Sequence, residues 1–355
     1  MTERPPSQCV GKGEIMQATL LDRMVNVTVF HKSPVGVYLR FWHWLWDHLP
    51  PSLTTLSVIR LHGNFLQTLV RMRAKRHQYF GTFFLRNRPQ LELIRRLAAH
   101  EFTHSPLRIS VLGSSNGAEV YSILWTIRSR HPHLQVILNA LDISPEILAL
   151  AQKGTYPLTI PELVNEPILE RMTKDEVAQM FDLEDNTVTI KPWIKEDIQW
   201  HLGDAADPNI LSRLGPQDIV VANNFMCHMY PQDAERCLRN IARLVSPGGY
   251  LFVSGIDLDI RTKVARDLGW VPVRDLIEPI HDGDPRVRAD WPFEYWGLEP
   301  LTRNRHDWQV RYASAFQLGR KTSSRHLGTL KGTALPPWPF RLLSVRRIHG
   351  ETQQP

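Results

Sequence analysis

Apolar and polar positions follow two different periods in the middle of the chain. Two short apolar runs, LRISVLG at 107–113 and LQVILNALDI at 134–143, end at or beside a glycine or an acid, which is typical of buried strands. Segments of helical periodicity follow such runs, as in AEVYSILWTIRSR at 118–130. Further runs of both kinds alternate from 217 to 320. This order predicts an α/β fold with a doubly wound, mostly parallel sheet.

One insertion interrupts this alternation of strands and helices, and segments of different composition lie before and after it. The segments TVTIKPWI at 187–194 and DIQWHLG at 197–203 indicate two short strands of a small inserted β element. The N-terminal part contains helical, basic segments, and the C-terminal part is rich in proline and basic residues without periodicity, so we expect a flexible tail there. The predicted parts are an N-terminal helical region at 1–106, a main domain at 107–320 with an insertion at 155–200, and a basic tail at 321–355.

An aromatic-rich segment, PVGVYLRFWHWLWDH at 34–48, has two interpretations. Trp42, Trp44 and Trp46 alternate there. A helix of this kind either lies at a membrane surface or packs as a cap on the main domain. The pattern favours the packed cap and leaves peripheral membrane contact through 34–48 open.

Charge divides the chain in the same places. The 355 residues have a formal net charge of +6. Residues 1–106 hold 14 basic and 6 acidic residues, residues 107–320 hold 22 and 29, and residues 321–355 hold 6 and 1. An acidic main domain with basic flanks predicts that the flanks dock partly on the main domain. A more specific prediction is that an acidic acceptor meets the N-terminal part, and we expect no nucleic-acid partner. The basic residues in question are Arg71, Arg73, Lys75, Arg76 and Arg86.

Composition excludes several classes of protein. With 43% apolar and 22% charged residues the chain is of ordinary globular composition. It has no run of about 20 apolar residues, so no membrane span is predicted, and its first residues lack a secretory signal. Cys9, Cys227 and Cys237 have no metal-type or redox-type spacing, which favours a reducing, cytoplasmic location.

Candidate chemistry lies in the turn from Gly113 to Gly117, between a predicted strand and helix. In such sheets ligands bind at the carboxyl ends of the strands, and glycine lets the backbone approach them closely. Asp142 ends the next strand, where a carboxylate can accept two hydrogen bonds from ribose hydroxyls. The G-x-x-x-G run lacks the third glycine of a dinucleotide site. A mononucleoside ligand such as S-adenosylmethionine (SAM) therefore fits better.

The sequence offers two alternatives to this site, a hydrolase nucleophile and a metal site. Gly113, Ser115 and Gly117 also match the G-x-S-x-G nucleophile elbow of hydrolases, but the preceding residues are mainly helical and no HGGG-type segment is present. The run from Glu278 to Asp284 contains three acids and His281, but it lacks the strict spacing of a metal site. We therefore expect neither a hydrolase nor a bound metal.

Four ordered segments between 79 and 254 resemble the CheR-type chemoreceptor glutamate methyltransferases. YFGTFFLRNRPQLELI is similar to their T-x-F-F-R segment, VLGSSNGAEVYSI to G-C-S-T-G-E-E-P-Y-S, LDISPEILALAQKGTYP to D-I-x-x-x-x-L-x-x-A-x-x-G-x-Y, and the stretch from Ile219 to Val253 to R-N-V followed by P-G-G-Y-L-F. The resemblance implies a class I SAM-dependent methyltransferase with a seven-stranded sheet.

The resemblance also implies roles for matched residues. Asp142 and Ile143 would hold the ribose, and Asp204 would accept a hydrogen bond from the adenine amine. The implied cofactor-binding residues are Thr82, Arg86, Gly113, Ser115, Gly117, Glu119, Asp142, Ile143, Asp204, Ala205, Asn224 and Phe225.

Arg86 and His228 are the candidate catalytic residues. Arg86 can hold a carboxylate acceptor bidentately and keep it ionised, whereas a hydroxyl acceptor would need a base such as His228. The chain departs from the family pattern at His228, where the family has tyrosine, and at Asn223, where it has arginine. A receptor-docking domain is not evident. The first hypothesis is therefore methylation of a protein carboxylate, as in glutamate methyl-ester formation. The second is methylation of a small molecule on oxygen or nitrogen. The third is that the chain is a degenerate SAM-binding or sensor module.

Overall fold

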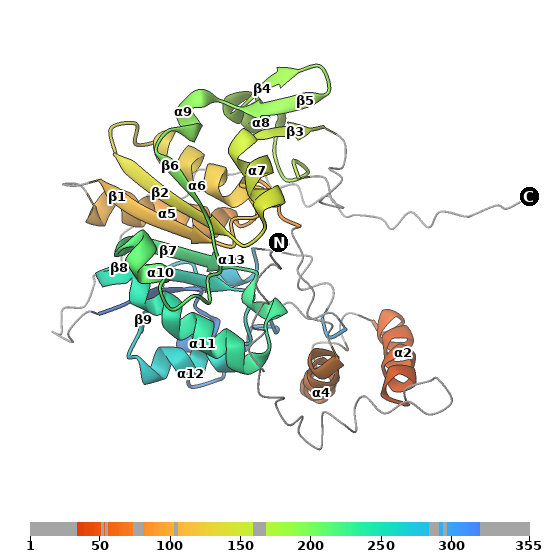
Figure 1. The fold of residues 1–355 in the computed structure, drawn as a ribbon. Coiled ribbons are helices and arrows are strands. Elements are labelled where there is room, and N and C mark those ends of the chain that lie inside the picture. The colour runs from red at the N-terminus through yellow and green to blue at the C-terminus, as the bar shows by residue number, and fades with distance from the viewer. Residues whose placement is uncertain are drawn as a thin grey trace, which may run out of the picture. The chain divides into compact units, whose positions relative to one another are not determined.

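The predicted strands form one mostly parallel sheet in the computed structural model (Figure 1). Its spatial order is β6 (Ile198–Leu202), β2 (Val136–Asp142), β1 (Leu107–Leu112), β7 (Gln217–Asn223), β8 (Val245–Ser254), β10 (Ala315–Gln317) and β9 (Val271–Pro272). Strands β6, β2, β1, β7 and β8 are parallel, and β10 is antiparallel to β8 and β9. The seven-stranded, doubly wound prediction is confirmed.

The structure describes most, but not all, of the chain. The described residues are 34–50, 53, 56–73, 81–102, 106–158, 168–283, 291–293 and 297–319. Several earlier predictions fall wholly or partly outside them: the N-terminal region before residue 34, Cys9, the basic residues Lys75 and Arg76, the acid Asp284, part of the insertion, and the tail at 321–355.

Successive strand residues point to opposite faces, which gives the sheet two cores. In β8, Tyr250 and Phe252 belong to one hydrophobic cluster, and Leu251 and Val253 belong to the other. Because helices cover both faces, the central strands are nearly continuous apolar runs. The first cluster contains residues of α5 (Arg88–Glu101), α6 (Ala118–Arg128) and α9 (Pro192–Lys195). The second contains residues of α10 (Ile210–Leu214), α11 (Pro231–Ile241), α12 (Leu258–Asp267) and α15 (Trp308–Tyr312). Helix α13 (Ile277–His281) contributes to both clusters.

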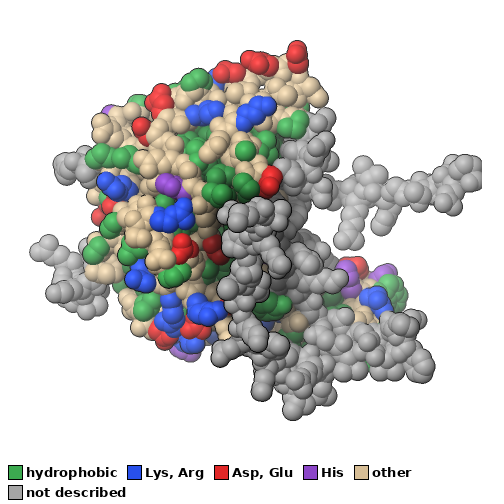
Figure 2. Space-filling view, in the orientation of Figure 1, with side chains coloured by type: hydrophobic (Ala, Val, Ile, Leu, Met, Phe, Trp, Pro, Cys, Tyr) green, Lys and Arg blue, Asp and Glu red, His purple; other side chains and the backbone are tan. Residues whose placement is uncertain are grey.

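The inserted β element is a separate three-stranded antiparallel sheet. It has the order β3 (Thr155–Pro157), β5 (Thr187–Ile190) and β4 (Phe181–Glu184). Helix α8 (Lys174–Met180) precedes β4 and begins at a capping box between Thr173 and Glu176. Acidic side chains gather at the tip of this element, over β4 and β5 (Figure 2).

One strand predicted for the insertion belongs to the main sheet instead. Strand β6, within the segment 197–203, pairs in parallel with β2 from Ile198 to Leu202. Ile198 and Trp200 pack against the first hydrophobic cluster. The alternating pattern correctly indicated a strand, but it holds no information about which strand is the partner, so the assignment to the insertion was wrong.

The described part of the N-terminal region is mainly helical, as predicted. It contains α2 (Pro34–Asp47) and α4 (Ser57–Arg73). The ring of Trp46 lies 5.6 Å from that of Trp291, and the ring of His43 stacks on Phe293 at 4.5 Å. A Cβ atom at Gly63 of α4 would lie 2.2 Å from the Trp291 indole, so only glycine permits this contact. One face of each helix is thus packed against residues 291–293.

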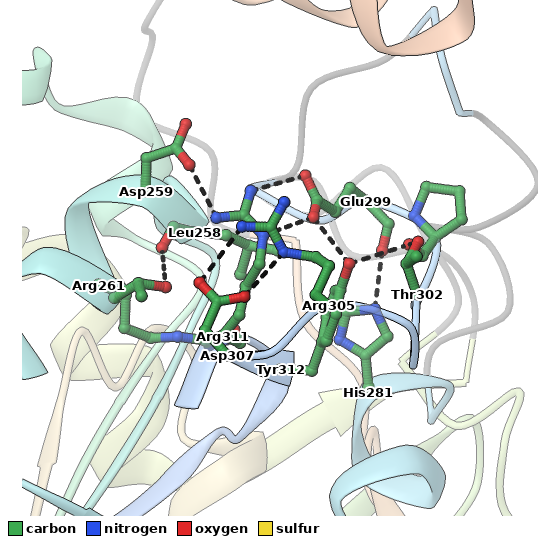
Figure 3. A network of polar contacts seen from close by, with 12 residues as sticks. Leu258, Asp259, Arg261, His281, Glu299, Thr302, Arg305, Asp307, Arg311 and Tyr312 are labelled. Atoms are coloured by element: carbon green, nitrogen blue, oxygen red, sulfur yellow. Dashed lines mark hydrogen bonds and ion pairs between the residues drawn. The ribbon is translucent and has the colours of Figure 1, made fainter. Parts of the chain in front are cut away.

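A polar network joins α12 and α15 (Figure 3), and α4 contacts it through Arg71. Arg311 donates two hydrogen bonds to Glu299 at 2.6 and 2.8 Å and one to Asp259 at 2.7 Å. Arg71 of α4 lies 3.6 Å from Asp259 and from Asp257. Because Arg311 is 6% exposed, its charge depends on these carboxylates for compensation.

Within the described residues, no helix is long and apolar enough to cross a membrane. In the same part of the chain, no three His, Cys, Asp or Glu side chains are grouped as a metal site would require.

Candidate active site

A pocket opens at the carboxyl ends of β1, β2 and β7, where the strand order reverses. Its volume is about 270 Å³. Every residue predicted to bind the cofactor or to act in catalysis lines it, with the exception of Gly117. A ligand site is expected at this point of a doubly wound sheet. The four sequence segments that resemble a known family are therefore brought to one place by the topology.

The turn after β1 presents backbone to the pocket. Gly113 has φ +71°, and a Cβ atom there would lie 2.9 Å from the ring of Phe225. Ser115 also has a left-handed φ, +48°, although it is not glycine, and such local strain is concentrated at functional sites. Gly117 has φ +85° at the start of α6 and lies against Tyr121, outside the pocket. Its role is to shape the turn, not to line the site.

Asp142 is fixed in place by the backbone around it. It ends β2 and is 5% exposed. Its Oδ2 accepts a hydrogen bond from the Ser115 N–H at 2.7 Å, and its Oδ1 accepts one from the Ser144 N–H at 3.0 Å. Ser144 in turn caps α7 (Pro145–Lys153). A carboxylate oxygen has two lone pairs, so both oxygens can still accept from a ligand's hydroxyl groups.

Glu119 lies in the first turn of α6 within a group of neutral polar side chains. The Asn223 Nδ2 donates to Glu119 Oε1 at 2.6 Å. The amides of Asn223 and Gln90 exchange two hydrogen bonds, at 3.2 and 3.4 Å, and Ser254 Oγ donates to Asn223 Oδ1 at 2.8 Å. Burial raises the pKa of Glu119, and the hydrogen bond from Asn223 and the charge of Arg86 offset this only in part. The Glu119 carboxyl therefore lies at the pocket, and the neighbours that form this hydrogen-bonded group with it are all neutral.

Arg86 reaches the pocket from a strained turn before α5. The Leu85 N–H, at φ +55°, donates to Ser122 Oγ at 3.0 Å, and the Phe84 N–H donates to the Ile168 carbonyl at 3.0 Å. The turn is thus held by α6 and by the insertion. The guanidinium carbon of Arg86 lies 5.8 Å from the centroid of the Phe83 ring. Thr82 and Phe83 line the pocket beside it.

His228 and Asn224 come from the segment that follows β7. Asn224 has φ +59°, and a Cβ atom at Gly255 would lie 2.4 Å from the Asn224 Cα. The next residues form the short helix η1 (Met226–His228). His228 lines the pocket, as does Phe225.

The residues that the resemblance assigns to the adenine lie after β6. The Gly203 N–H donates to the Asp142 carbonyl at 2.9 Å, which ties this loop to β2. Asp204 is exposed and accepts from the Ala206 N–H at 2.8 Å, and Ala205 is buried beside it. Ile143, after β2, is 49% exposed and lines the same pocket.

These residues fit a cofactor with a ribose, an amine and an adenine ring. Glu119, Asp142 and Asp204 supply three acceptor groups around one pocket. Ser114 also lines it, is 1% exposed, and has a hydroxyl without a hydrogen-bond partner in the described structure. Buried polar atoms are normally satisfied, so an unmatched hydroxyl at this wall is consistent with a ligand that completes it.

The comparison with protein families decides the assignment. The model described as "CheR methyltransferase, SAM binding domain" matches residues 81–258. The chain belongs to the CheR methyltransferase family. It is a SAM-dependent methyltransferase with SAM as its cofactor, as the four sequence segments and the pocket at the end of β1 also indicate.

Curated relatives agree at modest identity. A chemotaxis protein methyltransferase of Vibrio parahaemolyticus is 28% identical over 155 residues, which are 42% of this chain and 53% of the relative. An uncharacterized 104.1 kDa protein of Rhodobacter capsulatus is 27% identical over 205 residues, 54% of this chain and 20% of that protein. The chain thus spans about half the length of the first relative and a fifth of the second.

Among solved structures, the N-methyltransferase NodS of Bradyrhizobium japonicum with S-adenosylhomocysteine is similar with a TM-score of 0.32. The match is 15% identical and covers 54% of this chain and 78% of NodS.

Sequence reasoning missed part of the CheR-family site. Gln90 and Asn87 line the pocket from the start of α5, and Asn223 lines it from the end of β7. The sequence indicates Asn223 only as a departure from the arginine of the family. The amides at the start of α5 have no local sequence signal of function, whereas the replacement of arginine by Asn223 is such a signal.

Proposed function

We propose that this CheR-family enzyme methylates a carboxylate, as in methyl-ester formation on glutamate side chains of a protein. One observation supports the proposal most. Among the described residues that line the pocket, Arg86 is the one Lys or Arg, and it shares the pocket with the three acids Glu119, Asp142 and Asp204. Opposite charges in one pocket suit a cationic cofactor on one side and an anionic acceptor on the other.

The residues divide the work as follows. When bound, SAM supplies an electrophilic methyl group on a sulfonium. Asp142 accepts hydrogen bonds from the ribose hydroxyls, and Glu119 faces the amine of the cofactor. Arg86 binds the acceptor carboxylate, holds it ionised, and aligns an oxygen with the methyl group. Because an ionised carboxylate has no proton to lose, the transfer needs no general base.

Apolar walls strengthen the role of Arg86. Phe83, Leu91 and Ile94 line the pocket together with it. Where such side chains exclude water, the attraction between a guanidinium and a carboxylate is stronger than in bulk solvent. His228, under this proposal, bounds the pocket without taking a proton. A small-molecule acceptor with a hydroxyl group would instead require His228 as the base.

The test is transfer of labelled methyl from SAM into a lysate, followed by separation by size and treatment with base. We expect the label in protein, as base-labile ester. Arg86→Gln should lower kcat/KM for the acceptor by about tenfold to a hundredfold, the range for a lost charged hydrogen bond. It should leave calorimetric SAM affinity within about threefold.

His228→Gln is the matched control, since it removes a ring from the same pocket without removing the positive charge. For a carboxylate acceptor its rate should stay within about threefold and show no basic pKa in the pH profile. Label found only in small molecules, or a strong loss in His228→Gln with none in Arg86→Gln, would defeat the proposal.

A cytoplasmic location is part of the proposal. In the described part of the chain the buried Cys227 and Cys237 form no disulfide, which suits a reducing compartment.

A further inference from the structure

Helices α2 and α4 expose an apolar face. The exposed residues on α2 are spaced i, i+4, i+7 and those on α4 i, i+3, i+7, so each set lies along one side of its helix. Their exposed fractions run from 47% to 77%. The α2–α4 face consists of Val37, Phe41, Trp44, Val58, Leu61 and Phe65.

Ring contacts join the two helices into one surface. Phe41 lies 5.9 Å from Trp42, Trp42 lies 4.0 Å from His62 of α4, and His62 lies 6.2 Å from Phe65, all measured between ring centroids. The exposed rings at the two ends are thus linked by two partly buried ones. The α2–α4 face is continuous and not two separate stripes.

The opposite sides of both helices are already occupied. Trp46 and His43 contact residues 291–293, and Gly63 lies against Trp291. Arg71 fastens the end of α4 to Asp257 and Asp259. Both helices therefore satisfy their inner faces within the chain, and the outer apolar face has no role in this packing. Contiguous exposed apolar surface of this kind marks an interaction site.

The sequence that contains the two helices has an excess of cationic residues. Residues 34–80 contain six Lys and Arg and a single acid, Asp47. Arg40 and His48 are exposed on the same side of α2 as Trp44, whose ring lies 4.7 Å from that of His48. In Figure 2, histidine, cationic and hydrophobic side chains lie together with one acidic group where α2 lies.

We propose that the α2–α4 face binds a membrane surface that contains anionic lipid. Tryptophan and phenylalanine on one side of a helix, with Arg and His at its border, are typical of helices that lie in the lipid–water interface. Helices of 14 and 17 residues can lie in that plane, with their apolar sides in the headgroup region. The cationic residues add attraction to anionic headgroups.

A second copy of the chain suits this face less well. A two-fold interface places the same patch against itself, so the exposed Arg40 at the border of the face would lie close to cationic side chains of its own copy. Like charges across an interface oppose association. An anionic lipid surface matches both the apolar and the cationic character.

The test is co-sedimentation of the full chain with vesicles of phosphatidylcholine and phosphatidylglycerol, and with vesicles of phosphatidylcholine alone. We expect binding to the anionic vesicles, weakened by salt, and weaker binding to the neutral ones. The triple variant Phe41→Ser, Trp44→Ser, Phe65→Ser should lower the partition coefficient at least about tenfold. Leu183→Ser, a change of a 66% exposed leucine on β4, is the matched control and should bind as the wild type does.

Two further measurements separate the outcomes. SAM affinity by calorimetry should be unchanged in the triple variant, which shows that it is folded and that failure here is distinct from failure of the proposed methylation. Light scattering gives the mass without lipid. Absence of binding to anionic vesicles, equal binding by the triple variant, or a dimer that the triple variant dissociates would overturn the proposal, the last in favour of a second copy.

Discussion

The carboxyl group of Glu119 receives its hydrogen bond from the amide of Asn223 at 2.6 Å. The CheR-type pattern has an arginine at that position. A neutral donor stabilises a carboxylate less than a guanidinium does, so burial prevails and the pKa of Glu119 is raised. The donor at the end of β7 therefore affects the pKa of a residue on α6.

This pKa predicts how cofactor binding depends on pH. Protonated Glu119 cannot pair with the cofactor amine, so SAM affinity should fall as pH falls through the raised pKa. In Asn223→Ala the carboxylate loses a hydrogen bond, the pKa of Glu119 rises further, and the loss of affinity should begin at higher pH. Calorimetric Kd values from about pH 5 to about pH 8 measure this.

Glu119→Gln provides the reference, with weaker binding that is flat over the same range. Identical profiles for wild type and Asn223→Ala would contradict the argument. Stability without ligand has a definite sign as well. Since the folded pKa lies above the ordinary 4.5, the stabilisation from this group is full below pH 4.5 and is lost as pH rises through the folded pKa.

Single residues also show what a sequence can and cannot predict at a site. Asp142, Ser115 and Arg86 lie in local motifs, and the structure brings them to one pocket. Gln90 binds Asn223 across 133 positions of sequence, and no local pattern indicates that pairing. Gly117 matched the motif, yet its place beside Tyr121 puts it outside the pocket.

At the scale of elements, the position of α4 depends on the missing side chain of Gly63. Glycine within a helix costs about 1 kcal/mol relative to alanine, so an isolated α4 would gain from Gly63→Ala. In the folded protein the added Cβ would lie 2.2 Å from Trp291, and the indole would have to move.

We therefore expect opposite effects from neighbouring substitutions. Gly63→Ala should increase hydrogen exchange in α2 and α4 and shift tryptophan fluorescence. Asn64→Ala, at an exposed position, should slow exchange slightly, because alanine favours the helix by about 0.5 kcal/mol. Slower exchange in both variants would show that Trp291 does not constrain α4.

Element type was easier to predict from the sequence than element partnership. Periodicity gave the strands, the helices and the inserted β element. It assigned 197–203 to the wrong sheet, because Ile198 and Trp200 meet β2 only after the chain has returned from the insertion. Likewise, α2 is apolar nearly all round, so its pattern could not distinguish the packed side from the exposed one.

For the whole molecule, the network around Arg311 joins segments far apart in the sequence. Arg311→Met should lower the free energy of unfolding by about 3 kcal/mol, since it removes the cation bonded to Glu299 and leaves Asp259 with Arg71 alone. Urea unfolding measures this. Arg236→Ala, which removes an exposed ion pair with Asp233, should change it by less than about 1 kcal/mol. Equal effects of the two substitutions would mean that the network adds no more than a surface pair.

The strand order has a consequence for folding during synthesis on the ribosome. Strand β10 is last along the described chain, yet it lies between β8 and β9. While the ribosome is still translating, the edge of β8 stays unpaired until Ala315–Gln317 has left the exit tunnel. Nascent chains thus expose a backbone edge flanked by Leu251 and Phe252, the kind of edge that recruits strands from other chains. This topology therefore requires that the edge be shielded during synthesis, either by a chaperone or by rapid pairing of β10 with β8.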